Sequence, residues 1–234
     1  PEFTQLDLEM SFVEKEDVML LTEELLIKIV KGLFPEKKIL SLPFPRMDYK
    51  EAMSKYGTDR PDLRPDKNDP EALAFVWIEN FPFFSAEDGP ASRGEKKYTF
   101  THNPFSRPVA EHEEWLMKKV NIENIITSQY DIVLNGFEIG GGSLRNHRPE
   151  MLKKVFEIIG YADESIEQNF GHMLEAFSFG TPPHGGIAWG LDRLASILLL
   201  EPNIREVIAF PKTGEGRDLM MKTPAAILEL QLKE

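Results

Sequence analysis

The 234-residue sequence contains no cysteine. This absence excludes disulfide bonds and thiolate metal ligands, and it fits a reducing compartment such as the cytoplasm. No uncharged apolar run reaches the length of about 18 residues that a membrane helix needs, so we predict no membrane span. The first residues do not have the pattern of a signal peptide.

Basic residues are also fewer than acidic ones. The chain has 27 Lys and Arg against 39 Asp and Glu, which gives a formal net charge of −12. Domains that bind nucleic acid are usually basic, so a nucleic acid would have to meet a local patch or a part outside this sequence. No GxxxxGK[ST] or GxGxxG motif occurs, which excludes the P-loop and Rossmann solutions to phosphate binding.

What is present predicts an α+β fold with an antiparallel sheet flanked by helices, because strands joined by turns are mixed with amphipathic helices. The first strand, TQLDLEMSF, alternates between a polar and an apolar face. The expected strands are 4–12, 73–84, 125–134, 137–143 and 185–190. The expected helices are 14–34, 48–56, 110–120, 149–159, 165–179 and 191–201, and residues 85–97 are expected to form a surface loop.

The stretch DIVLNGFEIGGGSLRNH holds the main candidate site. Asn135-Gly136 predicts a two-residue hairpin turn, which pairs Val133 with Glu138 and places Asp131 opposite Gly140. Asp131 and Glu138 then share one face at roughly 5–7 Å, and Gly140 and Gly142 extend that face without side chains. Oxygen ligands at this spacing suit Mg²⁺, which commonly arrives with substrate phosphates. The alternative is a surface hairpin with solvated acids.

Arg145 could add a carboxylate-binding group to this site. Simple alternation places it on the opposite face from Glu138, so it reaches the site only if the glycines form a bulge that resets the pleat. Its planar fork could then grip a carboxylate through two parallel hydrogen bonds. The alternative is a surface arginine.

Three further groups are candidates for binding. The polar face of the first strand offers Gln5, Asp7 and Glu9, with Asp7 suited to an ammonium group and Glu9 to a nucleotide or a metal, or else it is a solvated face. In PPHGGIAWGLDRL a strand runs into a helix at Gly190, and Arg193 in the first turn suits a nucleotide phosphate. His102, in the turn-rich FTHNPFS, is either a site residue or polar surface; the remaining histidines have no metal-ligand spacing.

Taken in order, these pieces resemble the catalytic domain of bacterial-type aspartyl-tRNA synthetases, which are class II enzymes. The resemblance runs over nearly the whole chain and is most specific in its last three segments. It is carried by PEFTQLDLEMSF, DYKEAMSKYGTDRPDLR, HNPFS, YDIVLNGFEIGGGSLRNH, PPHGGIAWGLDRL and NIREVIAFPKT.

The resemblance implies an antiparallel sheet of six to seven strands with ATP bound in a bent form on its open face. It also implies two steps: aspartate attacks the α-phosphate of ATP, and the resulting adenylate passes its aspartyl group to tRNA. The implied site residues are Arg193 on the γ-phosphate, Gly190, Leu191 and Asp192 beside ATP, Glu138 on ATP and Mg²⁺ with Asp131 as helper, Arg145 on the side-chain carboxylate of aspartate, and His102, Asp7 and Gln5 around aspartate.

The departures from the family pattern lead to further expectations. The first motif, the first half of the second motif and the anticodon-binding barrel lie outside this sequence, so the 234-residue chain alone is expected to be inactive, although the full-length protein is expected to be a homodimer. Measurable pyrophosphate exchange by the chain alone would contradict this. About ten residues replace the family's inserted domain, and Asn103 stands where the family often has a second histidine.

Two other functions stay open at this point. One is a tRNA-independent paralogue, similar to asparagine synthetase, that activates aspartate without charging tRNA. The other is a non-catalytic regulatory module with the same fold, which the intact set of Asp131, Glu138, Arg145 and Arg193 argues against. Within the synthetase interpretation, Arg145 favours an acidic side chain over asparagine or lysine. The tRNA partner is that for aspartate and possibly also that for asparagine.

Overall fold

The computed structural model describes residues 2–86, 97–227 and 229–233. The chain divides into two compact units, and each is described by itself: residues 7–188, and residues 1–6 together with 189–234. The predicted surface loop at 85–97 falls largely outside the described residues. No helix in the described part of the chain is long and apolar enough to cross a membrane.

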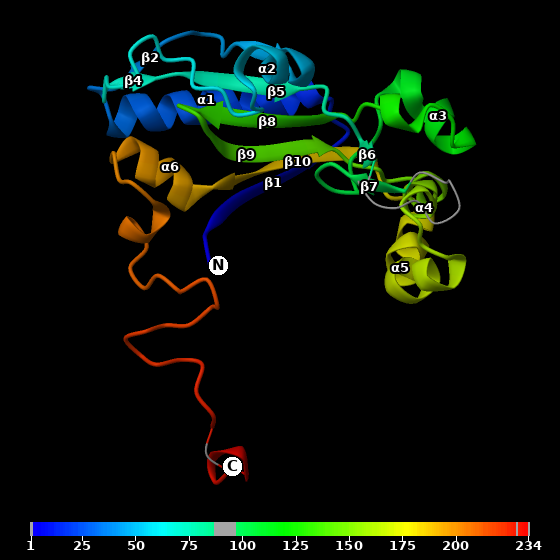
Figure 1. Ribbon diagram of the computed structural model, residues 1–234. Coiled ribbons are helices and arrows are strands. Elements are labelled where there is room, and N and C mark those ends of the chain that lie inside the picture. Colours follow the sequence, from blue (N-terminus) through cyan, green and yellow to red (C-terminus); the bar gives the residue numbers. More distant parts are fainter. Residues whose placement is uncertain (1, 87–96, 228, 234) are drawn as a thin grey trace. The chain divides into compact units, whose positions relative to one another are not determined.

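The larger unit is built on a six-stranded sheet (Figure 1). The strand order is β1-β10-β9-β8-β5-β3. The pairs β5–β8 and β8–β9 are antiparallel, as expected, whereas the edge strand β3 runs parallel to β5. The bounds are β1 (Gln5–Ser11), β3 (Arg46–Asp48), β5 (Phe75–Glu79), β8 (Gln129–Leu134), β9 (Phe137–Leu144) and β10 (His184–Gly190).

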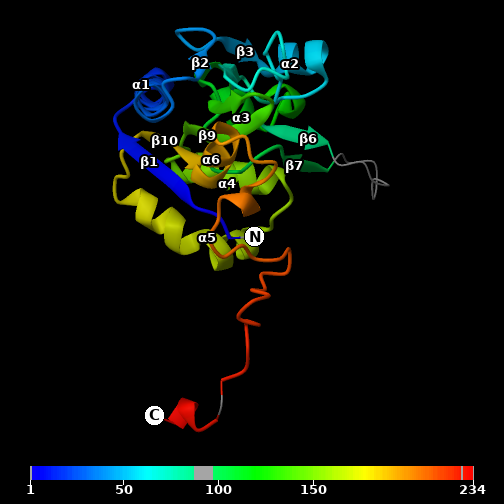
Figure 2. The ribbon, with the colours of Figure 1, turned by 90° about the vertical axis from the view of Figure 1, so that its left-hand side faces the viewer.

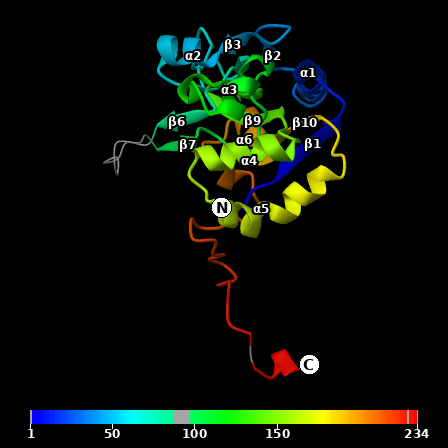
Figure 3. The same ribbon diagram turned by 90° about the vertical axis from the view of Figure 1, so that its right-hand side faces the viewer.

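Helices α1 (Lys15–Leu33) and α2 (Tyr49–Tyr56) cover opposite faces of this sheet (Figures 2 and 3). On the α1 face, the indole Nε1 of Trp77 donates a hydrogen bond of 2.9 Å to the buried carboxylate of Glu23. On the α2 face, Val76 and Val133 pack with Ala52. Because α2 is short, it covers only part of its face, and the polar residues of β8 and β9 lie beyond it.

Three helices of the same unit pack together through two apolar clusters. The helices are α3 (Glu113–Lys118), α4 (Pro149–Ile158) and α5 (Asp163–Ser178), and Figure 3 shows α4 and α5 side by side. One cluster lies between α3 and α4 and the other between α4 and α5. Leu152, Phe156 and Ile166 are the buried centre of the α4–α5 contact. The short pairs β2–β4 (Lys38–Ile39 with Ala72–Leu73) and β6–β7 (Phe84–Ala86 with Tyr98–Phe100) complete the unit.

Two details of the expected strands are wrong. The apolar side of β1 is only partly buried: Leu8 and Met10 are half-buried, whereas Leu6 is 46% exposed and Phe12, just beyond the strand, is 79% exposed. The apolar stretch 73–84 is not one strand, since Asn80 adopts a left-handed backbone conformation (φ 61°) that ends β5. The continuous apolar stretch therefore predicted which residues are buried better than it predicted where the strand ends.

The smaller unit contains the end of β10 and helix α6 (Leu191–Leu198). Gly190 is the residue before the helix, so the predicted passage from strand to helix is confirmed. The backbone N–H of Leu191 donates to the carbonyl oxygen of Thr4 (2.9 Å), and the carboxylate of Asp192 accepts from the backbone N–H of Thr4 (2.6 Å). These two bonds hold the first turn of α6 against the start of the chain.

Candidate active site

The hairpin of β8 and β9 has the predicted turn but a different register beyond it. Asn135 and Gly136 both have positive φ, and Leu134 pairs with Phe137 and Val133 with Glu138. The register then shifts, so that Ile132 pairs with Gly140 and Asp131 with Gly141. The prediction that Asp131 faces Gly140 is wrong, because one extra residue, Ile139, is accommodated in β9 as a bulge.

This bulge brings Arg145 to the same face as Glu138. With the pleat reset, Gly141, Ser143 and Arg145 follow one another on that face, and the Nη1 of Arg145 donates to Ser143 Oγ (3.1 Å). A β-carbon added at Gly141 would lie 2.7 Å from Asp131 Oδ1 and 3.6 Å from Glu138 Oε1. The two carboxylates therefore flank a bare backbone floor, and the condition set for Arg145 is met.

Asp131 is buried at the centre of this face, with only 4% of its surface exposed. Gln129 Nε2 donates a hydrogen bond of 3.1 Å to its Oδ1. Burial, and then the neighbouring charge of Glu138, raise the pKa of Asp131 well above its ordinary value. A buried carboxylate beside a second one is a site of excess negative charge, which a hard divalent cation would relieve.

We expect Asp131→Asn to stabilise the fold at neutral pH by about 1 kcal/mol, which is typical of a stabilising single substitution. Because the folded-state pKa of Asp131 is raised, the native state binds its proton more tightly than the unfolded state. Stability therefore falls as the pH rises from about 4, the unfolded pKa, towards the folded pKa.

Urea unfolding in EDTA at pH 5 and pH 8 measures this effect. The stability advantage of Asp131→Asn should widen from pH 5 to pH 8. The Gln129 hydrogen bond survives in this variant because the amide oxygen still accepts it. An advantage that shrinks as the pH rises would show that the carboxylate is not strained in the folded protein.

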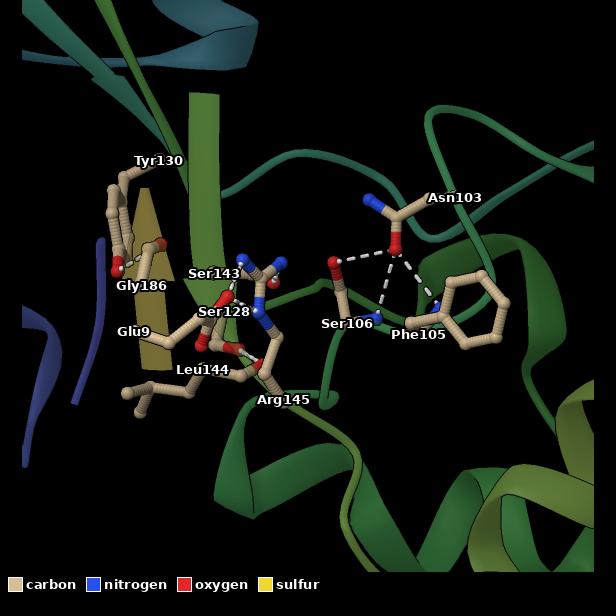
Figure 4. Close-up of polar contacts among 10 residues, drawn as sticks. All are labelled: Glu9, Asn103, Phe105, Ser106, Ser128, Tyr130, Ser143, Leu144, Arg145 and Gly186. Carbon is tan, nitrogen blue, oxygen red and sulfur yellow. Dashed lines mark hydrogen bonds and ion pairs between the residues drawn. The ribbon is translucent and has the colours of Figure 1, made fainter. Parts of the chain in front are cut away.

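Gly142 lies against neighbouring strands and not beside the two carboxylates. A β-carbon at Gly142 would fall on the carbonyl oxygen of Gly186 and lie 2.7 Å from the ring of Tyr130, on the α1 face of the sheet. The Tyr130 hydroxyl donates to that same carbonyl of Gly186 (3.0 Å; Figure 4), and burial raises the pKa of Tyr130. The prediction that Gly140 and Gly142 extend the floor of the site is therefore wrong, since they pair with Ile132 and Tyr130 and Gly141 lies beside Asp131.

Arg145 is held by an acid that sequence reasoning did not pair with it. Its Nε donates to Glu9 Oε1 (2.9 Å), and its Nη2 contacts the same oxygen (Figure 4). Both side chains keep some exposure, 24% for Arg145 and 43% for Glu9, so the pair borders solvent. Asp7 lies two residues before Glu9 on β1 and is exposed, on the face that alternation predicted.

His102 lies near the carboxylate pair. Its ring meets the ring of Phe81 edge-on, with centroids 4.7 Å apart. The loss of hydration there lowers the pKa of His102, while the carboxylates of Glu138 and Asp59 act in the opposite direction. Asp59 acts on Asp131 as well, so it is a third acid of this region. Sequence reasoning missed Asp59, which follows the helix-ending Gly57 in the segment GTDRP.

A cavity of about 410 Å³ borders the same strands. Gln129, the donor to Asp131, lies in its wall with Arg107, Ser128 and Leu144. The described residues contain no group of three or more His, Cys, Asp or Glu side chains that could hold a metal ion. Among the residues that the structure describes, a cation here would meet at most a pair of carboxylates, and other ligands would have to come with the substrate.

The predicted site residues fall into both units. Asp7, His102, Asp131, Glu138 and Arg145 belong to the larger unit, where the last three share one face. Gln5, Gly190, Leu191, Asp192 and Arg193 belong to the smaller unit, where the first turn of α6 carries Arg193. That Arg193 meets the same ligand as Glu138 stays a prediction.

Comparison with known proteins places this geometry in context. The family model described as "tRNA synthetases class II (D, K and N)" matches residues 1–214. The Aspartate–tRNA(Asp/Asn) ligase of Chlorobium luteolum is 31% identical over an alignment of 362 residues, which covers 100% of this chain and 58% of that protein. The ligase of the same name from Prosthecochloris aestuarii is 48% identical over 166 residues, covering 71% of this chain and 26% of that protein.

Solved structures show the same fold. The aspartyl tRNA synthetase of Entamoeba histolytica superposes with a TM-score of 0.64 at 23% identity, over 92% of this chain and 44% of that one. The asparaginyl-tRNA synthetase of the same organism, in complex with asparaginyl-adenylate, gives 0.62 at 21% identity, over 92% and 48%. This chain thus spans little more than half the length of the curated relatives that it matches in full.

Proposed function

Because this chain belongs to the family of class II tRNA synthetases for D, K and N, we propose that the intact gene product activates L-aspartate with ATP and transfers the aspartyl group to tRNA. One observation carries the choice of aspartate: the guanidinium of Arg145 lies on the same sheet face as the carboxylates of Asp131 and Glu138. A guanidinium group in that place suits the acidic side chain of aspartate better than the amide of asparagine or the ammonium of lysine.

The proposed roles follow from the contacts of each residue. Glu9 occupies one edge of the Arg145 guanidinium, so an incoming carboxylate would approach the remaining N–H groups of Nη1 and Nη2. Asp7, His102 and Gln5 are proposed to surround the amino acid. Gly190, Leu191, Asp192 and Arg193 are proposed to border ATP, because a helix start with an arginine favours phosphate.

Mg²⁺ is the proposed metal, and Asp131 and Glu138 would hold it. The fit rests on the buried Asp131 carboxylate and its charged neighbour across a glycine floor. When bound, the cation would neutralise phosphate charge as pyrophosphate leaves. The contribution of this chain would be positioning, since no residue needs to form a covalent intermediate with the aspartyl group.

We also propose that the chain lacks the inserted domain found in bacterial relatives. The alignment with the Chlorobium luteolum protein extends over 362 residues, whereas this chain has 234, which supports a large gap within it. The proposed partners are L-aspartate, ATP and tRNA, in a homodimer. The absence of cysteine supports a cytoplasmic setting.

The test is ATP–pyrophosphate exchange by the intact gene product with a panel of amino acids, followed by tRNA charging. Exchange that requires aspartate, together with transfer of labelled aspartate to tRNA, is the expected result. Aspartate-dependent exchange without charging would favour the tRNA-independent paralogue. Exchange with asparagine or lysine in preference to aspartate, or none with any amino acid, would overturn the proposal.

A further inference from the structure

Asn103 closes the turn that follows His102. Its side-chain oxygen Oδ1 accepts three hydrogen bonds: from the backbone N–H of Phe105 (2.9 Å), the backbone N–H of Ser106 (3.1 Å) and the hydroxyl of Ser106 (3.3 Å; Figure 4). An asparagine that bonds the backbone two and three residues ahead fixes a tight turn. The oxygen is fully committed to the turn, which leaves it no role as an acceptor for a ligand.

The turn delivers its last residues to the backbone around Arg145. The backbone N–H of Asn146 donates to Phe105 O (2.7 Å), that of Arg107 donates to Leu144 O (2.8 Å), and Ser106 forms an antiparallel bridge with Arg145. Ser106 is completely buried at this contact. Ser106, which donates two of the three hydrogen bonds to Asn103, is therefore the direct backbone neighbour of Arg145.

Two other sets of hydrogen bonds fix the backbone of Leu144 and Arg145. On its other side, the backbone N–H of Arg145 donates to His184 O of β10 (2.8 Å). The Ser128 hydroxyl lies within hydrogen-bond distance of both Arg107 O (2.9 Å) and Leu144 O (3.1 Å). The backbone of Arg145 is thus fixed between β10 and the turn, and Asn103 is the side chain that shapes the turn.

We propose that Asn103 is a positioning residue for amino-acid binding, which acts by holding the turn that places His102 and braces Arg145. This inference rests on the proposed function of Arg145. It assigns Asn103 a role through the backbone rather than through contact with the substrate. A misplacement of about 1 Å at a binding group has large kinetic effects, so the loss of the turn should be felt at the aspartate site.

The test compares Asn103→Ala with Asn103→Asp in the intact gene product. Asn103→Ala removes the acceptor of all three bonds, and we expect the KM for aspartate in pyrophosphate exchange to rise about 10-fold while the KM for ATP changes less than about twofold. Asn103→Asp keeps an acceptor oxygen and should restore the KM to within about threefold. Ser106→Ala, which removes only the hydroxyl donor, is the matched control, with a change below about twofold.

Hydrogen exchange provides a readout independent of activity. The amides of Phe105 and Ser106, which donate to Asn103, should exchange faster in Asn103→Ala and at nearly the original rate in Asn103→Asp. If the wild type carries out aspartate-dependent pyrophosphate exchange but Asn103→Ala has an unchanged KM for aspartate, this inference is overturned and the proposed function stands. Equal increases in the KM for ATP and aspartate also overturn it. A wild type without aspartate-dependent exchange overturns both.

Discussion

Replacing Arg145 with alanine is expected to lower kcat/KM for aspartate by about 100- to 1000-fold, while ATP binding is retained. A charge-assisted contact to a carboxylate is worth about 3–4 kcal/mol when one partner is truncated, and each 1.4 kcal/mol corresponds to a factor of ten. The loss should fall on aspartate because Arg145 is proposed to bind its side-chain carboxylate, whereas Arg193 in the first turn of α6 is proposed to border ATP. Pyrophosphate exchange at varied aspartate, with ATP binding measured by calorimetry, gives both quantities.

Two variants sharpen this test. Arg145→Lys keeps the charge but lacks the planar fork that contacts both Ser143 and Glu9, so it should recover only part of the activity. Arg148→Ala removes a nearby arginine whose partner is Glu113, and it should change kcat/KM less than about threefold. Unchanged use of aspartate by Arg145→Ala would remove the assigned role, and equal losses in the two alanine variants would point to a general effect of charge.

Replacing Gly142 with alanine is expected to destabilise the fold by about 3 kcal/mol or more. The added β-carbon would fall on the carbonyl oxygen of Gly186, and it would also press on the buried ring of Tyr130. Both neighbours belong to the interior of the sheet, and neither can move without breaking strand contacts, so the overlap has no inexpensive relief. Urea unfolding followed by circular dichroism measures the loss.

Gly141→Ala is the informative comparison, since the same substitution one residue earlier meets different atoms. Its β-carbon would meet the carboxylates of Asp131 and Glu138 rather than backbone. We expect a smaller stability loss, of about 1 kcal/mol, together with a large loss of Mg²⁺-dependent exchange. Gly32→Ala, which has open space at the added carbon, should leave both properties nearly unchanged. A Gly142→Ala protein as stable as Gly32→Ala would contradict the packing argument.

Local signals in the sequence predicted much of the site. The Asn135-Gly136 pair specified the turn and its first two pairings because the left-handed conformation that both positions adopt is a property of those residue types. Gly190 and the following LDRL indicated the passage from strand to helix, and Gly190 is the extended residue that precedes the first turn of α6. The order of the motifs indicated the family, and the family model and the curated relatives confirm it.

Contacts between distant segments could not be read from the sequence. Whether β9 accommodates Ile139 as a bulge depends on how its glycines pack against β10 and Tyr130, and that shift decides which glycine lies beside Asp131. The pairing of Glu9 with Arg145 joins residues 136 positions apart, and the three bonds of Asn103 matter only because the turn docks beside Arg145.

The sequence by itself therefore determined the turn, the helix start, the apolar segments and the family, since each depends on the conformational preferences of neighbouring residues. Only the tertiary structure decided the register beyond the turn, the partner of Arg145 and the separate tasks of Gly141 and Gly142. The physical reason is that side-chain alternation reverses with one inserted residue, and whether a strand takes that residue is settled by close packing against its neighbours.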